Sequence, residues 1–352
     1  MSERDEMVKQ AISNLERKYG KGVIMPFGKG LIVSDVEVIK TGSILLNIAL
    51  GVGGLPRGRI IEIFGPEASG KTTLALHAIA EAQKKGGLAV FVDAEHALDP
   101  TYAQKIGVQT DKLLLAQPTT AEEAIDIVDA LTRSGGIDII VLDSVAALVP
   151  KAELDGGIDE ASIGLQARMM SQALRIITGY ISKTKTVVIF VNQLREKIRM
   201  GFGYGPTETT PGGRALKFYA SVRIDVRRKA YINQGGETIG AQTVVKVVKN
   251  KLAPPFKSAE IDLFYGEGIC RESEIFALGE TTKIIKKSGS WYSFEDYRLG
   301  QGRENARQFL KENPEVADKI LHQALNELGI DPRIALNETG NNKEADEAKK
   351  ES

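Results

Sequence analysis

Short apolar runs alternate with amphipathic stretches through the middle of the chain. Runs rich in Val, Ile and Leu, typical of buried strands, occupy Arg59–Phe64, Leu88–Asp93, Lys112–Ala116, Ile137–Val145 and Thr186–Leu194. Apolar residues at helical spacing fill the gaps at Lys71–Lys84, Ala121–Arg133 and Ile163–Lys183. Strands that alternate with helices predict βαβ units, and therefore a mostly parallel sheet covered by helices on both faces.

The N-terminal segment is polar apart from one narrow apolar stripe. Apolar residues recur there at helical spacing, at Val8, Ile12, Leu15 and Tyr19. Residues 3 to 19 are therefore predicted to form a surface helix. The stripe suits either packing on its own domain or a contact with another subunit.

The pattern changes to strands beyond Arg214. Tyr219–Arg227 and Thr243–Val248 are predicted to extend the sheet in antiparallel fashion. A smaller, helix-rich α+β unit is predicted from about Cys270 to Ile330, and the polar end, Asn337–Ser352, is predicted to be disordered.

Composition excludes several classes of site. Lys plus Arg and Asp plus Glu both total 46, so a nucleic-acid site must be a local basic patch. Cys270 is the only cysteine, which excludes an internal disulfide and a cysteine-based zinc site. The charged N-terminus and the lack of a long apolar run lead us to expect a cytoplasmic protein with no membrane contact.

A glycine-rich motif joins the first predicted strand to the first predicted helix of the core. It matches the pattern G-x-x-x-x-G-K-[ST] in the strand–loop–helix context that this pattern requires. Its backbone N–H groups are expected to cradle phosphates, Lys71 to contact the β/γ oxygens and the Thr72 hydroxyl to ligate Mg²⁺. The expected ATP contacts are Gly65, Pro66, Glu67, Ala68, Ser69, Gly70, Lys71, Thr72 and Thr73.

Acidic residues end two other predicted strands. Asp143 follows four apolar residues and is expected to hold Mg²⁺ through water. Hydrolysis also needs a group that orients or deprotonates water, for which Glu95 is the candidate and Asp93 the alternative. His77 lies inside an apolar helix pattern, so we expect it to pack in the core.

Together with several longer stretches, these residues resemble the RecA family of bacterial DNA recombinases. The stretches are Phe91–Asp99, Val141–Leu148, Ala167–Gln172, Gly212–Ser221 and Val247–Lys251, and the similarity reaches from the N-terminal helix to about Ile330. The resemblance implies a RecA-like P-loop ATPase core over residues 34–269. It also implies an N-terminal helix and polymerisation arm over 1–33, a DNA-capture domain over 270–330 and a disordered polar tail over 331–352.

The resemblance also implies individual roles. Glu95 would activate the attacking water and Gln193 would sense the γ-phosphate. Lys249 and Lys251, which the sequence alone would leave as solvated lysines, would reach the γ-phosphate bound by the neighbouring copy. The residues implied near the adenine are Asp99, Tyr102 and Tyr265.

A glycine-rich stretch, Ile198–Arg214, follows the last parallel strand. The resemblance implies that about Leu194–Thr210, together with Asp155–Ser162, binds DNA. Residues 195–214 contain four basic and two acidic side chains, an excess that suits phosphate contacts, and aromatic or apolar side chains there suit stacking on bases. The expected DNA contacts are Arg168, Arg195, Lys197, Arg199, Met200, Phe202, Gly212, Gly213 and Arg214.

The implied activity is DNA-dependent ATP hydrolysis, with Mg²⁺, in a helical filament on single-stranded DNA. Homologous pairing with duplex DNA, strand exchange and promoted self-cleavage of a LexA-type repressor would follow. A ring helicase with the same core and a non-enzymatic nucleotide-gated DNA scaffold are the open alternatives. The lysines at 283–287 beside Trp291 suit a solvated face next to a core tryptophan or, by resemblance, capture of duplex DNA.

Overall fold

The structure is a computed structural model that describes residues 3–21, 23–24, 36–156, 164–196 and 208–336. The chain divides into two compact units, Met1–Val36 and Glu37–Ser352. In the first unit, helix α1 (Glu3–Tyr19) confirms the predicted helix, and none of its residues is buried. Its apolar stripe is therefore on the helix surface, with Val8 and Tyr19 more than half exposed.

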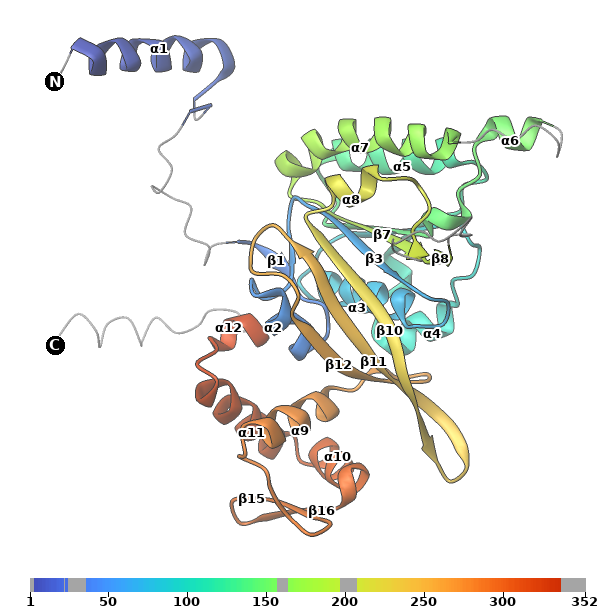
Figure 1. Ribbon diagram of the computed structural model, residues 1–352, viewed down its shortest axis with the longest axis vertical. Helices are drawn as coiled ribbons and strands as arrows, with labels where there is room; N and C mark the ends of the chain where they lie inside the picture. The colour runs from blue at the N-terminus through green and yellow to red at the C-terminus, as the bar shows by residue number, and fades with distance from the viewer. Residues whose placement is uncertain (1–2, 22, 25–35, 157–163, 197–207, 337–352) are drawn as a thin grey trace, which may run out of the picture. The chain divides into compact units, whose positions relative to one another are not determined.

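A sheet of nine strands forms the frame of the second unit (Figure 1). From one edge to the other its strands are β13 (Gly268–Ile269), β12 (Ser258–Phe264), β11 (Glu237–Asn250), β10 (Val222–Gln234), β3 (Ile60–Gly65), β7 (Val187–Gln193), β6 (Ile139–Asp143), β4 (Ala89–Asp93) and β5 (Leu113–Ala116). The six strands from β10 to β5 run parallel, and β10 to β13 pair antiparallel. This confirms the predicted mostly parallel sheet and its antiparallel extension.

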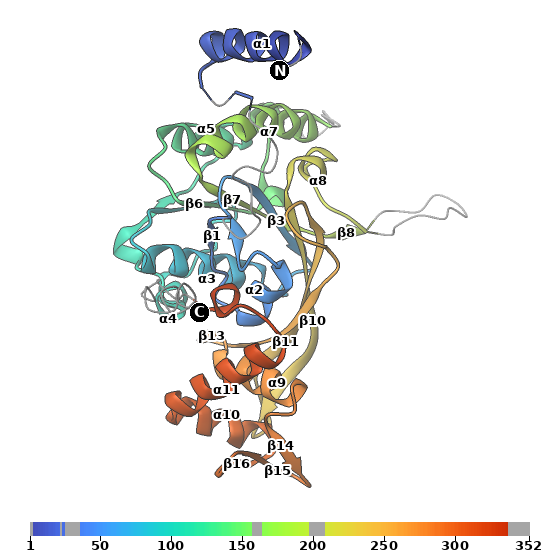
Figure 2. The same ribbon diagram turned by 90° about the vertical axis from the view of Figure 1, so that its left-hand side faces the viewer.

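Helices cover both faces of the parallel strands (Figure 2). One face packs against α2 (Ile44–Leu50), α3 (Lys71–Lys84) and α4 (Pro100–Ile106). The other packs against α5 (Ala121–Ser134), α7 (Leu165–Thr184) and α8 (Ala215–Tyr219). Because both faces are covered, successive strand residues are all buried, which explains the continuous apolar runs in the sequence.

The hairpin of β10 and β11 is longer than the sequence pattern predicts. The two strands pair from Val222 opposite Asn250 as far as Gln234 opposite Glu237, whereas β10 pairs with β3 only over Val222–Asp225. Residues 227–231 are exposed, so they show no apolar alternation that would mark them as strand. Strand β12 was also not predicted, although its buried and exposed residues alternate as a half-buried strand requires.

The C-terminal part combines helices with a small antiparallel sheet around its own core. The helices are α9 (Arg271–Thr281), α10 (Gly302–Glu312) and α11 (Pro314–Glu327), and the strands are β14 (Lys286–Ser288), β15 (Trp291–Phe294) and β16 (Tyr297–Gln301). Trp291 is 43% exposed, so its interpretation as a core tryptophan was wrong. The buried aromatic residues are its neighbours Tyr292 and Phe294, together with Phe276.

Short elements connect these parts. They are β1 (Val38–Ile39), β2 (Leu55–Pro56), η2 (Thr110–Lys112), η3 (Val145–Ala147), α6 (Lys151–Asp155), β8 (Arg195–Glu196), β9 (Glu208–Thr209) and α12 (Pro332–Ala335). Within the residues that the structure describes, no helix combines the length and apolarity needed to cross a membrane.

Candidate active site

The loop between β3 and α3 is shaped by two glycines. Gly70 caps the start of α3 with φ 96°, and a Cβ there would lie 2.4 Å from a methyl carbon of Leu263. A Cβ on Gly65 would lie 2.0 Å from the Val226 carbonyl oxygen. Only glycine fits at either position. The first turn of α3 carries no acidic residue, so its free N–H groups are available to an anion.

Lys71 is a buried cation inside this loop. Its side-chain ammonium donates to the Pro66 carbonyl oxygen at 2.6 Å, and the residue is 8% exposed. Burial lowers the pKa of Lys71, while the nearby carboxylates of Asp143, Glu95 and Glu67 act in the opposite direction. The buried Ser69 hydroxyl has no hydrogen-bond partner among the described residues. Both groups are therefore suited to donate to phosphate oxygens.

Thr72 and Asp143 meet at the end of β6. The Thr72 hydroxyl donates to Asp143 Oδ2 at 2.6 Å. Burial, reinforced by the charges of Glu95 and Asp93, raises the pKa of Asp143 to about 6 despite the opposing Thr72 hydrogen bond and Lys71 charge. A hydroxyl beside a desolvated carboxylate is a hard-oxygen donor set of the kind that Mg²⁺ takes together with phosphate oxygens and water, so these residues fit the ion.

Glu95 follows β4 and receives two hydrogen bonds on one oxygen. Gln193, the last residue of β7, donates from Nε2 to Glu95 Oε1 at 3.1 Å, and the Ser144 hydroxyl donates to the same atom. The backbone N–H of Glu95 donates to the Asp143 carbonyl oxygen at 3.3 Å. No described residue donates to Oε2, so that oxygen is open to a water molecule.

Asp93, the alternative base, has a different environment. Its carboxylate is buried and accepts from the backbone N–H groups of Ala97 and Leu98, both at 3.2 Å, and from the Gln117 amide at 3.3 Å. These bonds hold the loop that carries Glu95. The geometry therefore favours Glu95 over Asp93 as the base.

Of the residues expected near the adenine, Tyr102 contacts the first turn of α3. Asp99 caps α4 by accepting from Thr101 N at 2.8 Å, and the Tyr102 hydroxyl is 2.8 Å from the Thr73 hydroxyl. Burial raises the pKa of Tyr102. Tyr265 follows β12 and is 58% exposed. Tyr102 thus packs on the core and also contacts the first turn of α3.

His77 packs in the core, as predicted. Its Nε2 accepts from the Ile269 backbone N–H at 2.9 Å. Burial, followed by the charge of Lys84, lowers the pKa of His77 to about 4. The side chain is therefore neutral near pH 7 and serves as a structural acceptor.

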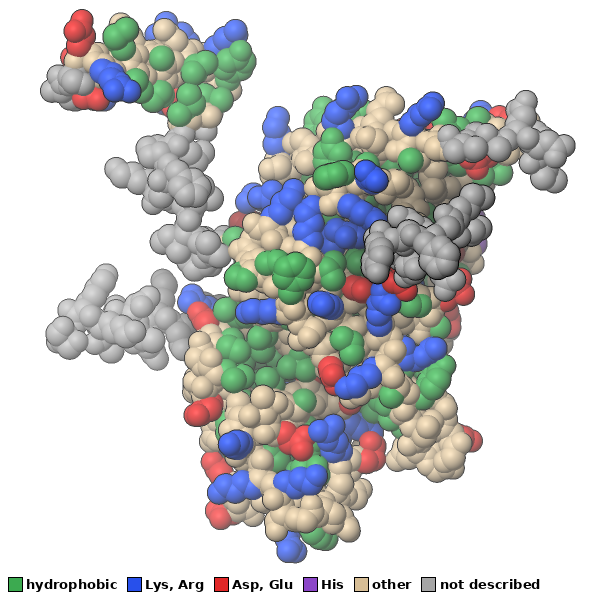
Figure 3. Space-filling model, in the orientation of Figure 1, with side chains coloured by type: hydrophobic (Ala, Val, Ile, Leu, Met, Phe, Trp, Pro, Cys, Tyr) green, Lys and Arg blue, Asp and Glu red, His purple; other side chains and the backbone are tan. Residues whose placement is uncertain are grey.

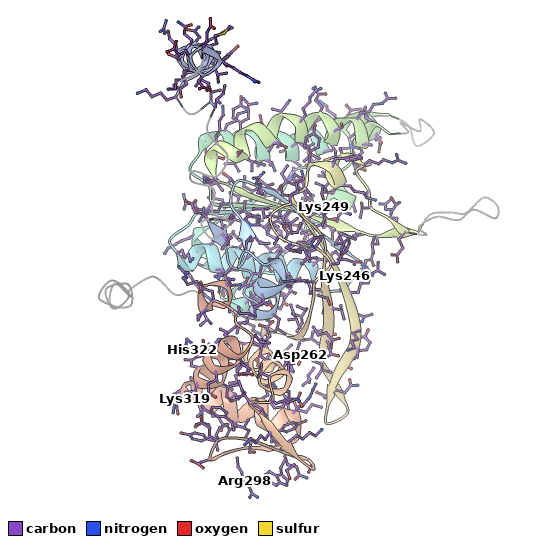
Figure 4. The ribbon with its side chains drawn as sticks, turned by 60° about the vertical axis from the view of Figure 1, so that its left-hand side comes forward. Lys246, Lys249, Asp262, Arg298, Lys319 and His322 are labelled. Carbon is purple, nitrogen blue, oxygen red and sulfur yellow. The ribbon has the colours of Figure 1, made fainter. Side chains whose placement is uncertain are left out.

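Lys249 and Lys251, at the end of β11, are not freely solvated. Lys249 Nζ donates to the carbonyl oxygens of Lys217 and Phe218 at 2.6 and 3.1 Å, and Lys251 Nζ donates to Phe218 at 3.4 Å. They neutralise the C-terminal end of α8. Lys249 is labelled in Figure 4, and Figure 3 shows Lys and Arg side chains gathered over α8 and the adjoining part of the sheet.

The expected DNA contacts fall into two groups. Lys197, Arg199, Met200 and Phe202, with most of Asp155–Ser162, lie outside the described residues. The others are described: Arg168, Arg195 and Arg214 are exposed, while Gly212 and Gly213 have φ of 79° and 74°.

These two glycines have a packing role that the sequence did not predict. A Cβ on Gly212 would lie 2.9 Å from Val145 Cγ1, and one on Gly213 would lie 2.7 Å from the Ala167 Cβ. Gln166 donates to the Val145 and Leu148 carbonyl oxygens at 2.9 Å and accepts from Gly212 N at 3.3 Å. The sequence analysis did not single out Gln166, although this residue directly precedes the stretch Ala167–Gln172. It also missed Ser144, although a polar residue directly after Asp143 was a usable signal.

Two comparisons with known proteins agree over most of the chain. Residues 6–270 match the RecA N-terminal domain family and residues 273–329 match the RecA C-terminal domain family. The chain is 63% identical over 320 residues to Protein RecA of Caldanaerobacter subterraneus subsp. tengcongensis. These residues make up 91% of this chain and 93% of that protein. The chain is 56% identical over 331 residues to Protein RecA of Bacillus subtilis, which is 94% of each chain.

Proposed function

The chain belongs to the RecA family, and from that premise we propose that it polymerises on single-stranded DNA, pairs it with a homologous duplex and exchanges strands. It is a DNA-dependent ATPase of the recombinase class and takes part in DNA recombination, DNA repair and the SOS response. The hydrogen bond between Gln193 and Glu95 carries the proposal, because Gln193 directly precedes the segment proposed to bind DNA.

The loop Gly65–Thr73 binds the phosphates of ATP. The free N–H groups at the start of α3 and the Lys71 ammonium donate to the phosphate oxygens, and the unpartnered Ser69 hydroxyl is placed to add a further bond. Asp99, Tyr102 and Tyr265 hold the adenine. Thr72 and Asp143 hold Mg²⁺, which when bound supplies positive charge to the phosphate oxygens.

Glu95 accepts a proton from the attacking water at Oε2. The Ser144 hydroxyl holds Oε1 and orients the carboxylate, and the Gln193 amide shares this atom before a γ-phosphate is present. When a γ-phosphate is present, the Gln193 amide exchanges its contact with Glu95 for one with the phosphate. Leu194, at the start of the DNA-binding segment, then moves with it, which couples the nucleotide to DNA binding.

Each hydrolytic site is completed by the next copy of the chain. Lys249 and Lys251 contact the γ-phosphate of the neighbour, as an arginine finger does. A head-to-tail contact that does not close gives a helical filament. The apolar stripe of α1 supplies a surface of the kind that such a contact needs.

The chain is divided by role into an N-terminal arm (1–33), an ATPase core (34–269), a DNA-capture domain (270–330) and a polar tail (331–352). The first residues of this tail are not disordered as predicted, because Pro332–Ala335 forms α12 and packs on the C-terminal core. Single-stranded DNA contacts Arg168, Arg195, Gly212, Gly213 and Arg214, together with Lys197, Arg199, Met200 and Phe202. The lysines at 283–287 capture duplex DNA. The filament promotes self-cleavage of a LexA-type repressor, and the protein acts in the cytoplasm.

Electron microscopy tests this assembly. With single-stranded DNA and a non-hydrolysable ATP analogue, we expect helical filaments that cover the DNA. Closed rings would favour a helicase with the same core. Binding without any regular assembly would favour a nucleotide-gated scaffold.

A further inference from the structure

A row of polar side chains crosses three neighbouring strands on one face of the sheet. Asn192 comes from β7, Glu62 from β3 and Arg223 from β10, and these strands lie side by side in the sheet (Figure 1). Glu62 and Asn192 are both 0% exposed. The register places Glu62 directly opposite Arg223 and Arg223 opposite Lys249.

The contacts within the row form one connected network. Asn192 Nδ2 donates to Glu62 Oε1 at 3.2 Å, and Arg223 Nε donates to Glu62 Oε2. Asn192 Nδ2 also donates to the Pro211 carbonyl oxygen at 3.1 Å, and its Oδ1 accepts from the Gln193 backbone N–H at 3.0 Å. Burying a carboxylate is costly even when it is paired, and apolar side chains of similar volume are often as stable. The stability of the sheet therefore does not by itself explain why this buried network is present.

The network ends at two functional points. On one side Asn192 is bonded to the backbone of Gln193, whose side chain contacts Glu95, and Leu194 N donates to the Gly65 carbonyl oxygen at 3.3 Å. On the other side Pro211 directly precedes Gly212, Gly213 and Arg214. Glu62 is the only one of these groups that contacts both Asn192 and Arg223 among the described residues.

We propose that Glu62 is a positioning residue that, through Asn192, fixes Gln193 relative to Glu95 and joins it to the turn at residues 211–214. Occupancy of the nucleotide site thereby sets the affinity for DNA. This inference rests on the proposed function, because it takes Gln193 as the γ-phosphate sensor and this turn as part of the DNA surface.

The test uses Glu62→Gln in the full-length protein. The amide removes the charge partner of Arg223 and places an N–H group among existing donors. We measure the ratio of affinities for single-stranded DNA with a non-hydrolysable ATP analogue and with ADP. We expect the ratio to fall about tenfold, within the usual range of coupling between two sites. We also expect kcat for DNA-stimulated hydrolysis to fall, with KM for ATP within about twofold of wild type, since Glu62 does not contact the nucleotide loop.

Asp138→Asn is the matched control. Asp138 pairs with Arg57 at 2.7 Å and accepts from Leu88 N at 2.9 Å, so the change also converts a partly buried, paired acid to its amide. It lies at the start of β6, away from the nucleotide loop. We expect the affinity ratio of this variant to equal that of wild type.

Two further variants separate positioning from a general loss of stability. Asn192→Ser removes the amide that spans Glu62 and Pro211, and we expect the same fall in ratio. The double variant Glu62→Gln with Asn192→Ser breaks the same link twice, so we expect its ratio to fall no further than that of either single variant. An unchanged ratio in either folded single variant, or a lower unfolding midpoint with a normal ratio, overturns the inference. A wild-type protein with no difference between the two nucleotides overturns the proposed function instead.

Discussion

Glu95 illustrates how neighbouring residues give a common side chain a specific role. Its Oε1 atom accepts hydrogen bonds from Ser144 and Gln193, while its backbone is fixed to the end of β6. A free carboxylate in a loop would sample several rotamers, but this one has its orientation fixed by donors from two strands. Oε2, to which no described residue donates, therefore keeps one direction.

Glu95→Gln tests the base at this scale. The amide is nearly isosteric but cannot accept a proton, so we expect turnover to fall about 10²–10⁴-fold while nucleotide binding is retained. Single-strand-stimulated ATPase rates and equilibrium nucleotide binding measure the two effects. Asp126→Asn, an exposed acid on α5, serves as control. Near-normal turnover in Glu95→Gln would assign the base to another residue.

Glu274 gives a prediction about pH. Burial raises its pKa from 4.5 to about 7, although its carboxylate accepts from the Ser43 hydroxyl and the Ile44 backbone N–H at the start of α2. The folded protein therefore holds a proton that the unfolded chain releases near pH 4.5. Stability from this group is present below that value and decreases as the pH rises toward 7, by at most about 1.4 kcal/mol per unit.

Glu274→Gln removes this contribution, because the amide is neutral at every pH. Urea unfolding of both proteins between pH 4.5 and 7.5 gives the difference in unfolding free energy. We expect that difference to shift steadily in favour of the variant as the pH rises. A difference that is constant with pH would show that Glu274 titrates normally in the folded state.

At the scale of elements, the parallel strands and the helices between them were predictable because their burial is continuous and their spacing regular. The loop at Gly65–Thr73 was also predictable, because its glycine, lysine and threonine spacing is a local pattern between a strand and a helix. The part of β10 beyond Arg227 was not, because its residues are exposed or only partly buried and therefore leave no apolar pattern.

Contacts between distant residues limited the prediction of the site. Asn192 lies in an apolar run, and nothing in that run indicates a partner 130 residues away at Glu62. Similarly, nothing near Gly212 and Gly213 in the sequence indicates that they pack against Val145 and Ala167. Sequence spacing identifies residues that act locally, but it does not identify pairs that the sheet brings together.

The segment that follows β7 gives a prediction about salt. Arg195 is exposed at its described start, and Lys197 and Arg199 follow it in the sequence. Replacing all three with alanine should weaken single-strand binding uniformly across sequences. Each lost phosphate contact should reduce the slope of log affinity against log salt by about 0.7. Fluorescence titrations over a salt series measure it, with Lys105→Ala as control, and an unchanged slope would exclude phosphate contacts from these side chains.

For the whole molecule, the proposed site is shared between copies. Lys71→Ala removes the loop cation, and the pair Lys249→Ala with Lys251→Ala removes the cations offered to the neighbour, so each protein alone should lack DNA-stimulated hydrolysis. A mixture should recover part of the activity, because some interfaces combine an intact loop with an intact lysine pair. ATPase assays over a range of mixing ratios test this. If filaments shown to contain both proteins recover no activity, the two lysines act only within their own chain, where they bind the end of α8.

The most direct test of the account is a strand-exchange measurement. A labelled single strand is incubated with the protein, ATP and Mg²⁺, and then with a duplex that is either homologous or unrelated in sequence. The account predicts a new labelled duplex and a displaced strand only with the homologous duplex, and neither product with Lys71→Ala. Displacement that proceeds equally with unrelated duplexes, or no exchange by a protein that hydrolyses ATP on DNA, would contradict it.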